Sequence, residues 1–140
     1  MNYYIVIHDV KSFEQHPDWI GRAETRRPGA LHSLKPGDGI VYYCKNDCVV
    51  TGTFTISSAP RMEVNDPLWK GPHTVLTITP VAKAEGDHYI PMQQMLEELD
   101  EPLSIFPDRR LRGATFWHRT LVPITEQDFR LITDYVRNYR

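Results

Sequence analysis

The stretch "LHSLKPGDGIVYYCKN", residues 31–46, contains a tight charged turn that leads directly into a strongly β-forming segment. The proline and glycines of Lys35-Pro36-Gly37-Asp38-Gly39 end a preceding helical turn and make a sharp corner. The β-branched and aromatic residues that follow predict a strand near 39–44, ending in Tyr42 and Tyr43. Because side chains alternate along a strand, the two tyrosines should point to opposite faces, and only one can serve a given binding site.

The rest of the chain predicts an α+β domain in which strands alternate with short helices. Further strands are expected at 3–10, 48–57, 74–84 and 114–124, and helices at 12–16, from Pro91 to Leu99 and from Thr125 onward. Thr125 should be the N-cap of the last helix, with Asp128 as its acidic partner. Residues 60–73 contain three prolines and are expected to form a long loop. Five or six strands in this order favour a small, curved, barrel-like sheet.

Length and composition are those of one ordinary globular domain, 1–140, with 41% hydrophobic and 24% charged residues. Apolar runs reach only about five residues, whereas a membrane-spanning helix needs about 20. We therefore expect a cytoplasmic protein without a membrane partner, either a monomer or a weak dimer. The net charge of -2 excludes a protein that coats a duplex by positive charge alone. A local basic surface formed by clustered arginines is still compatible with this net charge.

Catalytic and metal-binding patterns are absent from the sequence. Its six histidines are scattered, and none stands at the spacing of a nucleophile or metal set. Cys44 and Cys48 lack a second pair that would complete a zinc site, and reduced thiols are favoured over a disulfide between them. Gly37 to Gly39 precede their strand, whereas a phosphate-binding loop follows one. We expect no metal, no cofactor and no catalytic residues.

The three tryptophans all stand in polar settings, in "PDWIGR", "PLWKGP" and "TFWHRT". A tryptophan of the core usually lies in an apolar run, and a partly buried loop anchor is the alternative for each one taken alone. Together with nearby arginines they favour an aromatic slot that stacks a planar base while the guanidinium groups hold phosphates. The candidate phosphate-binding residues are Arg26, Arg27, Arg109, Arg110, Arg112 and Arg119.

Three motifs resemble the EVE domain, a member of the PUA-like superfamily related to YTH domains. They are the Lys35 to Asp38 turn before an aromatic-ending strand, "G-x-x-x-I" from Gly52 to Ile56, and "R-x-L-x-P-I-x-x-x-D-F" from Arg119 to Phe129. The resemblance covers residues 17 to 133 and implies a PUA-like mixed open β-barrel with flanking short helices. It also implies a concave pocket that takes a single, often modified, base.

The resemblance carries over a set of base-binding residues. By position, Tyr43 matches a strand-terminal tyrosine, Ile20-Gly21-Arg22 match a tryptophan–glycine segment, and Trp69 matches a tryptophan between strands. Two departures are that Trp19 stands one position before the usual aromatic and that Trp117 adds a ring. The implied base-binding set is Trp19, Ile20, Gly21, Arg22, Tyr43, Trp69, Trp117 and His118.

Three functions are compatible with these features. The first is a non-enzymatic module that binds DNA or RNA through one base, plain or methylated. The second is a binder of small molecules or nucleoside metabolites that uses the same pocket without a polymer. The third is a hydrolase of the related ASCH-like group, with Lys35, Asp38 or His118 taking part, although the sequence contains no assembled acid/base set.

Overall fold

The computed structural model describes residues 1–23, 29–116 and 119–139. Within these ranges the chain forms one curled sheet of eight strands with the order β2-β6-β4-β3-β1-β8, to which β5 adds at β6 and β7 at β4. The strands are β1 (Tyr3–His8), β2 (Trp19–Ala23), β3 (Gly39–Cys44), β4 (Val49–Ile56), β5 (Arg61–Glu63), β6 (His73–Lys83), β7 (Ile90–Pro91) and β8 (Leu121–Ile124). The helices are α1 (Val10–Gln15), α2 (Met92–Glu98) and α3 (Glu126–Asn138), with 3-10 turns η1 (Ala30–Ser33) and η2 (Gly113–Phe116).

The turn before β3 sets the central strand pairing. Asp38 is 4% exposed, and its carboxylate accepts hydrogen bonds from the amides of Asn2, at 3.1 Å, and Lys35, at 3.0 Å. These bonds bring the start of β3 beside the start of β1, and the two strands pair in parallel. A Cβ at Gly39 would lie 2.6 Å from Cδ1 of Tyr3, so only glycine fits this corner.

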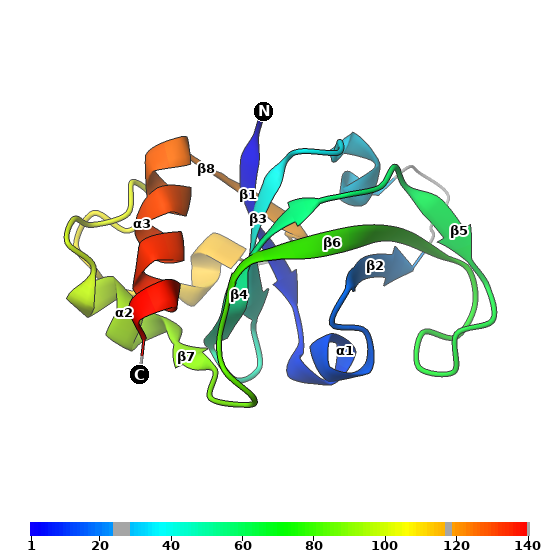
Figure 1. The fold of residues 1–140 in the computed structure, drawn as a ribbon, viewed down its shortest axis with the longest axis horizontal. Coiled ribbons are helices and arrows are strands. Elements are labelled where there is room, and N and C mark those ends of the chain that lie inside the picture. The colour runs from blue at the N-terminus through cyan, green and yellow to red at the C-terminus, as the bar shows by residue number, and fades with distance from the viewer. Residues whose placement is uncertain (24–28, 117–118, 140) are drawn as a thin grey trace.

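The two faces of the sheet pack against different elements. Figure 1 shows α2 and α3 at one end of the molecule, and α1, β2 and β5 at the other. One core cluster joins Val41 and Tyr43 of β3 to residues of α2 and α3, whereas a second joins Ile40 and Tyr42 to Phe13 of α1. The predicted alternation of the two tyrosines is therefore confirmed.

Most of the predicted elements are present, and α3 begins as expected. Thr125 accepts a hydrogen bond from the Asp128 amide at 3.0 Å, and the Asp128 carboxylate accepts one from the Thr125 amide, which completes a capping box. Asp128 also holds the chain before α3, since its carboxylate accepts from both the amide and the hydroxyl of Ser104.

Three elements differ from the sequence-based prediction. Among the described residues of the predicted strand 114–124, only Leu121–Ile124 form a strand, because residues up to Phe116 belong to η2, where Phe116 packs against Phe106. The segment after α1, where no strand was predicted, contains β2, which pairs with β6 through Ile20 and Leu76. The predicted loop 60–73 contains the short strand β5. Both additional strands depend on pairing with distant β6, which local propensity does not report.

Candidate functional site

Two tryptophans lie in turns that share the pattern x-Pro-x-Trp, His16-Pro17-Asp18-Trp19 and Asp66-Pro67-Leu68-Trp69. In the first turn the Trp19 amide donates to the His16 carbonyl oxygen at 3.2 Å. In the second, Oδ1 of Asp66 accepts from the amides of Leu68, at 2.9 Å, and Trp69, at 2.8 Å. Proline at the second position fixes the turn, and the first residue of each turn is left facing the other turn.

His16 and Asp66 connect the two turns directly. Nε2 of His16 makes a short contact with Oδ2 of Asp66, and the two side chains are only 15% and 5% exposed. Burial by itself would raise the pKa of Asp66, but hydrogen bonds from the Trp69 and Leu68 amides and from His16 outweigh it and lower that pKa. The carboxylate is therefore charged at neutral pH.

The imidazole of His16 contacts both indoles. Its ring centroid is 4.5 Å from that of Trp19, with an angle of 21° between the planes, and 4.8 Å from that of Trp69, with an angle of 53°. These are ordinary distances for aromatic contacts. We call the group of Trp19, His16 and Trp69 the tryptophan slot, since one planar ring lies against both indoles.

Trp69 is fixed from several sides and is 7% exposed. Its Nε1–H donates to Oγ of Ser12 at 3.1 Å, which ties the indole to α1. A Cβ built on Gly21 would lie 2.5 Å from Cζ3 of Trp69, so the indole packs directly on the backbone of β2. Any side chain at position 21 would push the ring away.

Further aromatic rings extend from the slot into the core. His8 stacks on Tyr42 at 5.5 Å and on Trp69 at 5.6 Å, and His73 stacks on Trp69 at 5.7 Å. Burial lowers the pKa of His8, although Asp9 and a backbone hydrogen bond with Gly21 oppose the shift. A buried imidazole is thus kept neutral near pH 7, beside the Tyr42 hydroxyl, whose pKa burial raises.

A cationic side chain covers the outer indole. The guanidinium of Arg61 lies 4.9 Å from the ring centroid of Trp19, and its Nη1 donates to Oγ1 of Thr77 at 2.9 Å. Arg22 is exposed on β2, on the other side of β6 from Arg61. The guanidinium of Arg61 therefore lies at the slot, and Arg22 stands three residues along β2 from Trp19.

The structure brings together only part of the predicted base-binding set. Trp19, Gly21 and Trp69 meet at the slot, while Ile20 is fully buried in the second core cluster. Arg22 lies on the same strand as Trp19. Trp117 and His118 lie outside the described residues.

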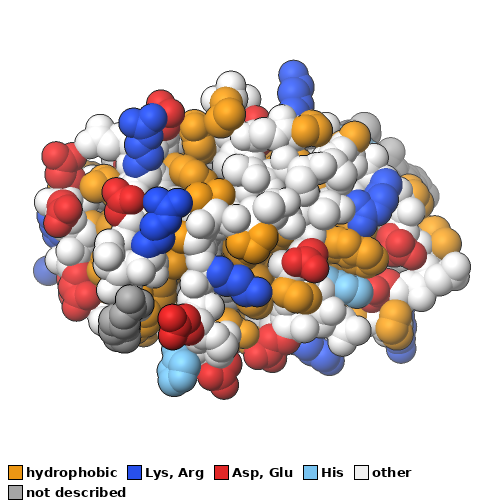
Figure 2. Space-filling model, in the orientation of Figure 1, with side chains coloured by type: hydrophobic (Ala, Val, Ile, Leu, Met, Phe, Trp, Pro, Cys, Tyr) orange, Lys and Arg blue, Asp and Glu red, His pale blue; other side chains and the backbone are white. Residues whose placement is uncertain are grey.

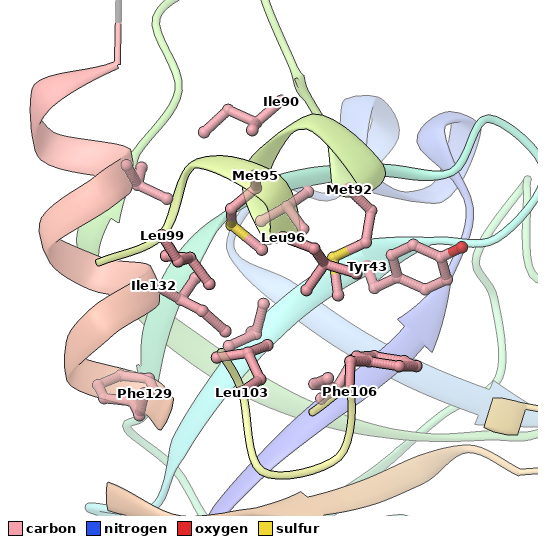
Figure 3. Packing of buried hydrophobic residues seen from close by; sticks show 14 of the residues in the cluster. Tyr43, Ile90, Met92, Met95, Leu96, Leu99, Leu103, Phe106, Phe129 and Ile132 are labelled. Atoms are coloured by element: carbon pink, nitrogen blue, oxygen red, sulfur yellow. The ribbon is translucent and has the colours of Figure 1, made fainter. Parts of the chain in front are cut away.

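Tyr43 lies on the other face of the sheet, away from the tryptophan slot. It is 2% exposed and packs among Met92, Leu96 and Phe106, as Figure 3 shows. Its ring centroid is 4.7 Å from that of Phe116, and burial raises the pKa of its hydroxyl. A separate hollow of about 660 Å³ begins at this tyrosine and is lined also by Lys45, Asn46, Cys48, Leu111, Gly113 and Phe116. The sequence-based prediction that Tyr43 and Trp69 share one slot does not match this arrangement.

The predicted phosphate-binding arginines also separate into different groups. Nη1 of Arg109 donates to the Leu99 carbonyl at 2.6 Å and also reaches the carbonyls of Leu96 and Glu97, so this guanidinium caps the end of α2. Arg112 pairs with Asp108. Arg110 and Arg119 are exposed, and Arg26 and Arg27 lie outside the described residues.

Charged side chains and potential metal-ligating side chains are spread over the described part of the molecule. Figure 2 shows acidic and basic side chains interspersed over the face in view. Within the described residues, no three His, Cys, Asp or Glu side chains are grouped to hold a metal ion. No helix in the same ranges is long and apolar enough to cross a bilayer. Asp38, a residue of the hydrolase alternative, uses its carboxylate to accept hydrogen bonds from the amides of Asn2 and Lys35 at the turn before β3.

Sequence reasoning missed several residues of the site, chiefly His16, Asp66, His8 and Arg61. A usable signal was present for the first two, because each stands three positions before a tryptophan and directly before a proline. His8 follows a buried run in β1, and nothing local distinguishes it. Arg61 is near Trp19 only because β5 and β2 both pair with β6.

Comparison with known proteins identifies the fold. No family model matches the sequence, and no curated protein does. Among solved structures, human THYN1 in complex with 5-methylcytosine containing DNA is 12% identical, with 100% of both chains covered and a TM-score of 0.58. The Pho92 YTH domain in complex with m6A is 11% identical, with 99% of this chain and 85% of that chain covered and a TM-score of 0.65.

The fold is of the EVE and YTH type. A Toxoplasma CPSF4 YTH domain in complex with a 7-mer m6A-modified RNA extends the likeness, at 11% identity over 99% of this chain and 92% of that chain, with a TM-score of 0.60. The PUA-like α+β fold expected from the sequence is thus confirmed. At these identities the likeness establishes the EVE/YTH-type fold, and function is argued from the site.

Proposed function

We propose that this EVE/YTH-type domain binds nucleic acid non-enzymatically by taking a single base, plain or methylated, into the tryptophan slot. The observation that carries the proposal is that Trp19 and Trp69 both lie against one planar heterocyclic ring, that of His16. Solved neighbours of the same fold, which include complexes with 5-methylcytosine containing DNA and with m6A, support it.

The energetics of base insertion favour such a slot. Taking a base out of its stack costs a few kcal/mol, and stacking on protein rings returns about 1 to 3 kcal/mol per base. Trp19 can supply this stacking and Trp69 a tilted ring contact, and neither depends on base sequence. A methyl group on the base adds apolar contact of about 0.8 kcal/mol when it is fully buried, so modification strengthens binding where no hydrogen bond is lost.

Arg22 and Arg61 are the residues we assign to the phosphates beside the inserted base. Arg22 is exposed on β2, and Arg61 already lies over Trp19 at 4.9 Å. Phosphate contact by these two arginines requires no extended basic surface, which agrees with the net charge of -2. We therefore expect a shallow dependence of affinity on salt, equivalent to about two phosphate contacts.

The net charge of -2 is also compatible with a second function, binding of a free nucleoside in the same slot. The two functions differ in their dependence on the polymer. A free nucleoside binder should have the same affinity for a nucleoside and for an oligonucleotide that contains it, and salt should have little effect.

The test is titration with short oligonucleotides that carry 5-methylcytosine, N6-methyladenine or plain bases, with the free nucleosides in parallel. Trp19→Leu should weaken binding about 10-fold or more, because one stacking ring is lost while Trp69 keeps its packing. Tyr135→Leu, which removes a half-buried aromatic ring on α3, is the matched control and should bind like the native chain. Failure of every oligonucleotide and nucleoside to bind at low salt would exclude the proposal.

A further inference from the structure

We propose that the side chain of His16 occupies the binding position of a base when no ligand is bound. A base enters the tryptophan slot by displacing the His16 ring, and it takes over both the contacts with Trp19 and Trp69 and the hydrogen bond to Asp66. The inference rests on the proposed function, because it concerns the same slot, and it adds a requirement on the chemistry of the ligand.

The His16 ring occupies the position that an inserted base would take. The imidazole is a planar heterocycle with ring nitrogens, and it lies 4.5 Å and 4.8 Å from the centroids of the two indoles. A stacked base needs the same positions, so His16 and a base exclude one another. The affinity measured for a base is then the intrinsic affinity reduced by the fraction of molecules in which His16 has left.

The second step concerns the hydrogen bond that His16 leaves behind. Oδ1 of Asp66 accepts from the amides of Leu68 and Trp69, and Oδ2 contacts His16 Nε2. The carboxylate is 5% exposed, and loss of a partner to a buried charge is costly. An incoming base must therefore present an N–H donor to Oδ2. The amino groups of adenine and cytosine do so, as does N6-methyladenine, whereas the amino nitrogen of N6,N6-dimethyladenine has no hydrogen.

The third step is that the imidazole can leave without unfolding its turn. The backbone of His16 keeps its own partners, since its amide donates to the Ser12 carbonyl at 2.9 Å and its carbonyl accepts from the Trp19 amide at 3.2 Å. Its side chain is already 15% exposed. Rotation of the side chain toward solvent breaks the ring contacts and the Asp66 contact but none of these backbone bonds.

The experiment first measures occupancy without nucleic acid. In a Trp117→Phe background, Trp19 and Trp69 are the only tryptophans, and acrylamide quenching of selectively excited tryptophan emission reports their exposure. His16→Ala should increase quenching about twofold or more, and added free imidazole should reverse the increase. His88→Ala, an exposed histidine in the turn before β7, should leave quenching as it was. Unchanged quenching in His16→Ala, or no reversal by imidazole, would overturn the inference.

The same proteins are then titrated with oligonucleotides of one sequence that carry adenine, N6-methyladenine or N6,N6-dimethyladenine. His16→Ala should bind the first two about 10-fold more tightly than the native chain, because the competing ring is gone. The native chain should bind the dimethylated base about 10-fold more weakly than the monomethylated one, and Asp66→Asn should lose this discrimination while keeping the Oδ1 hydrogen bonds of its turn. Weaker or equal binding by His16→Ala would overturn the inference and leave the proposed function in place.

Failure of the proposed function has a different signature. No oligonucleotide or nucleoside would then bind either the native chain or His16→Ala. In that case the proposal that a base displaces His16 fails as well, and the quenching and imidazole results show only whether a free ring can replace the His16 ring between the two indoles.

Discussion

The two faces of β3 carry adjacent tyrosines into different surroundings. Tyr43 enters an apolar cluster with residues of α2 and α3, and its ring lies 4.7 Å from that of Phe116. Tyr42 enters the other cluster and stacks on His8 at 5.5 Å, with Trp69 on His8 in turn. Both faces pack against apolar clusters, and the face of Tyr42 is joined in addition to His8 and Trp69 through stacked rings. The same residue type has two roles because the pleat assigns neighbouring side chains to different layers.

Two stacked rings in the layer of Tyr42 carry buried polar atoms without a partner. Within the described residues, Nε2 of His8 and the hydroxyl of Tyr42 lack a hydrogen-bond partner, as does Oγ1 of Thr51 on β4. Unpaired buried polar atoms are rare in folded proteins and occur often at binding or catalytic sites. The two unpaired atoms of His8 and Tyr42 lie in the same layer as the tryptophan slot, the site that we propose for binding, whereas Tyr43 packs in the apolar cluster with α2 and α3.

The largest effect that would test this division is that of Tyr43→Ala. Removal of an almost fully buried ring should lower the free energy of unfolding by about 3 kcal/mol or more. Urea denaturation measures this loss, and oligonucleotide affinity below the unfolding transition should be unchanged. If Tyr43→Ala folded normally and lost affinity, Tyr43 would belong to the binding site, as the sequence predicts.

Gly21→Ala tests whether the packing of the Trp69 indole on the backbone of β2 is needed for stability and binding. The new Cβ would lie 2.5 Å from Cζ3 of Trp69, so the indole must move, at a cost of about 1 to 3 kcal/mol in unfolding free energy. Affinity for a base should fall with it. Gly113→Ala is the matched control, because its Cβ would meet nothing within 4 Å, and it should be neutral in both measurements.

Arg109 and Arg110 are adjacent but should differ in effect. Arg109→Ala removes the cap on the carbonyls that end α2 and should cost about 1 kcal/mol of stability without altering salt dependence. Arg110→Ala should leave stability unchanged, because this side chain is exposed. If Arg110 contacts phosphate, its loss should lower the slope of log affinity against log salt by about one. An altered slope for Arg109→Ala would contradict its assignment to the cap.

The smallest effect expected is a pH dependence that arises from His8. Burial lowers the pKa of this imidazole in the folded protein, so below about pH 6.5 the unfolded chain takes up a proton that the folded protein does not. Stability from this group is complete above that pH and declines as the pH falls. Urea midpoints between pH 7.5 and 5.5 should therefore decrease in the native chain and less so in His8→Phe. Equal decreases would show that His8 does not cause the decline.

Local patterns predicted much of the fold and part of the site. The turn at Lys35 to Gly39, the strand after it and the capping box at Thr125 each depend on residues close in sequence, and each is present as expected. Gly21 and Trp69, which the EVE resemblance places in one predicted site, lie in contact. Arg109 was misread, since a guanidinium that caps a helix and one that binds phosphate look alike in sequence.

The sequence by itself determined the alternation of Tyr42 and Tyr43 and the turn at Lys35 to Gly39, because these follow from backbone preferences that act over a few residues, and its element order and EVE motifs indicated the class of fold. Only the tertiary structure decided which tyrosine shares a layer with Trp69, and that His16 meets Asp66 between the two turns. Those contacts join segments about 50 residues apart. They arise because β2 and β5 both pair with β6, and pairing between distant strands leaves no local trace in the amino-acid sequence.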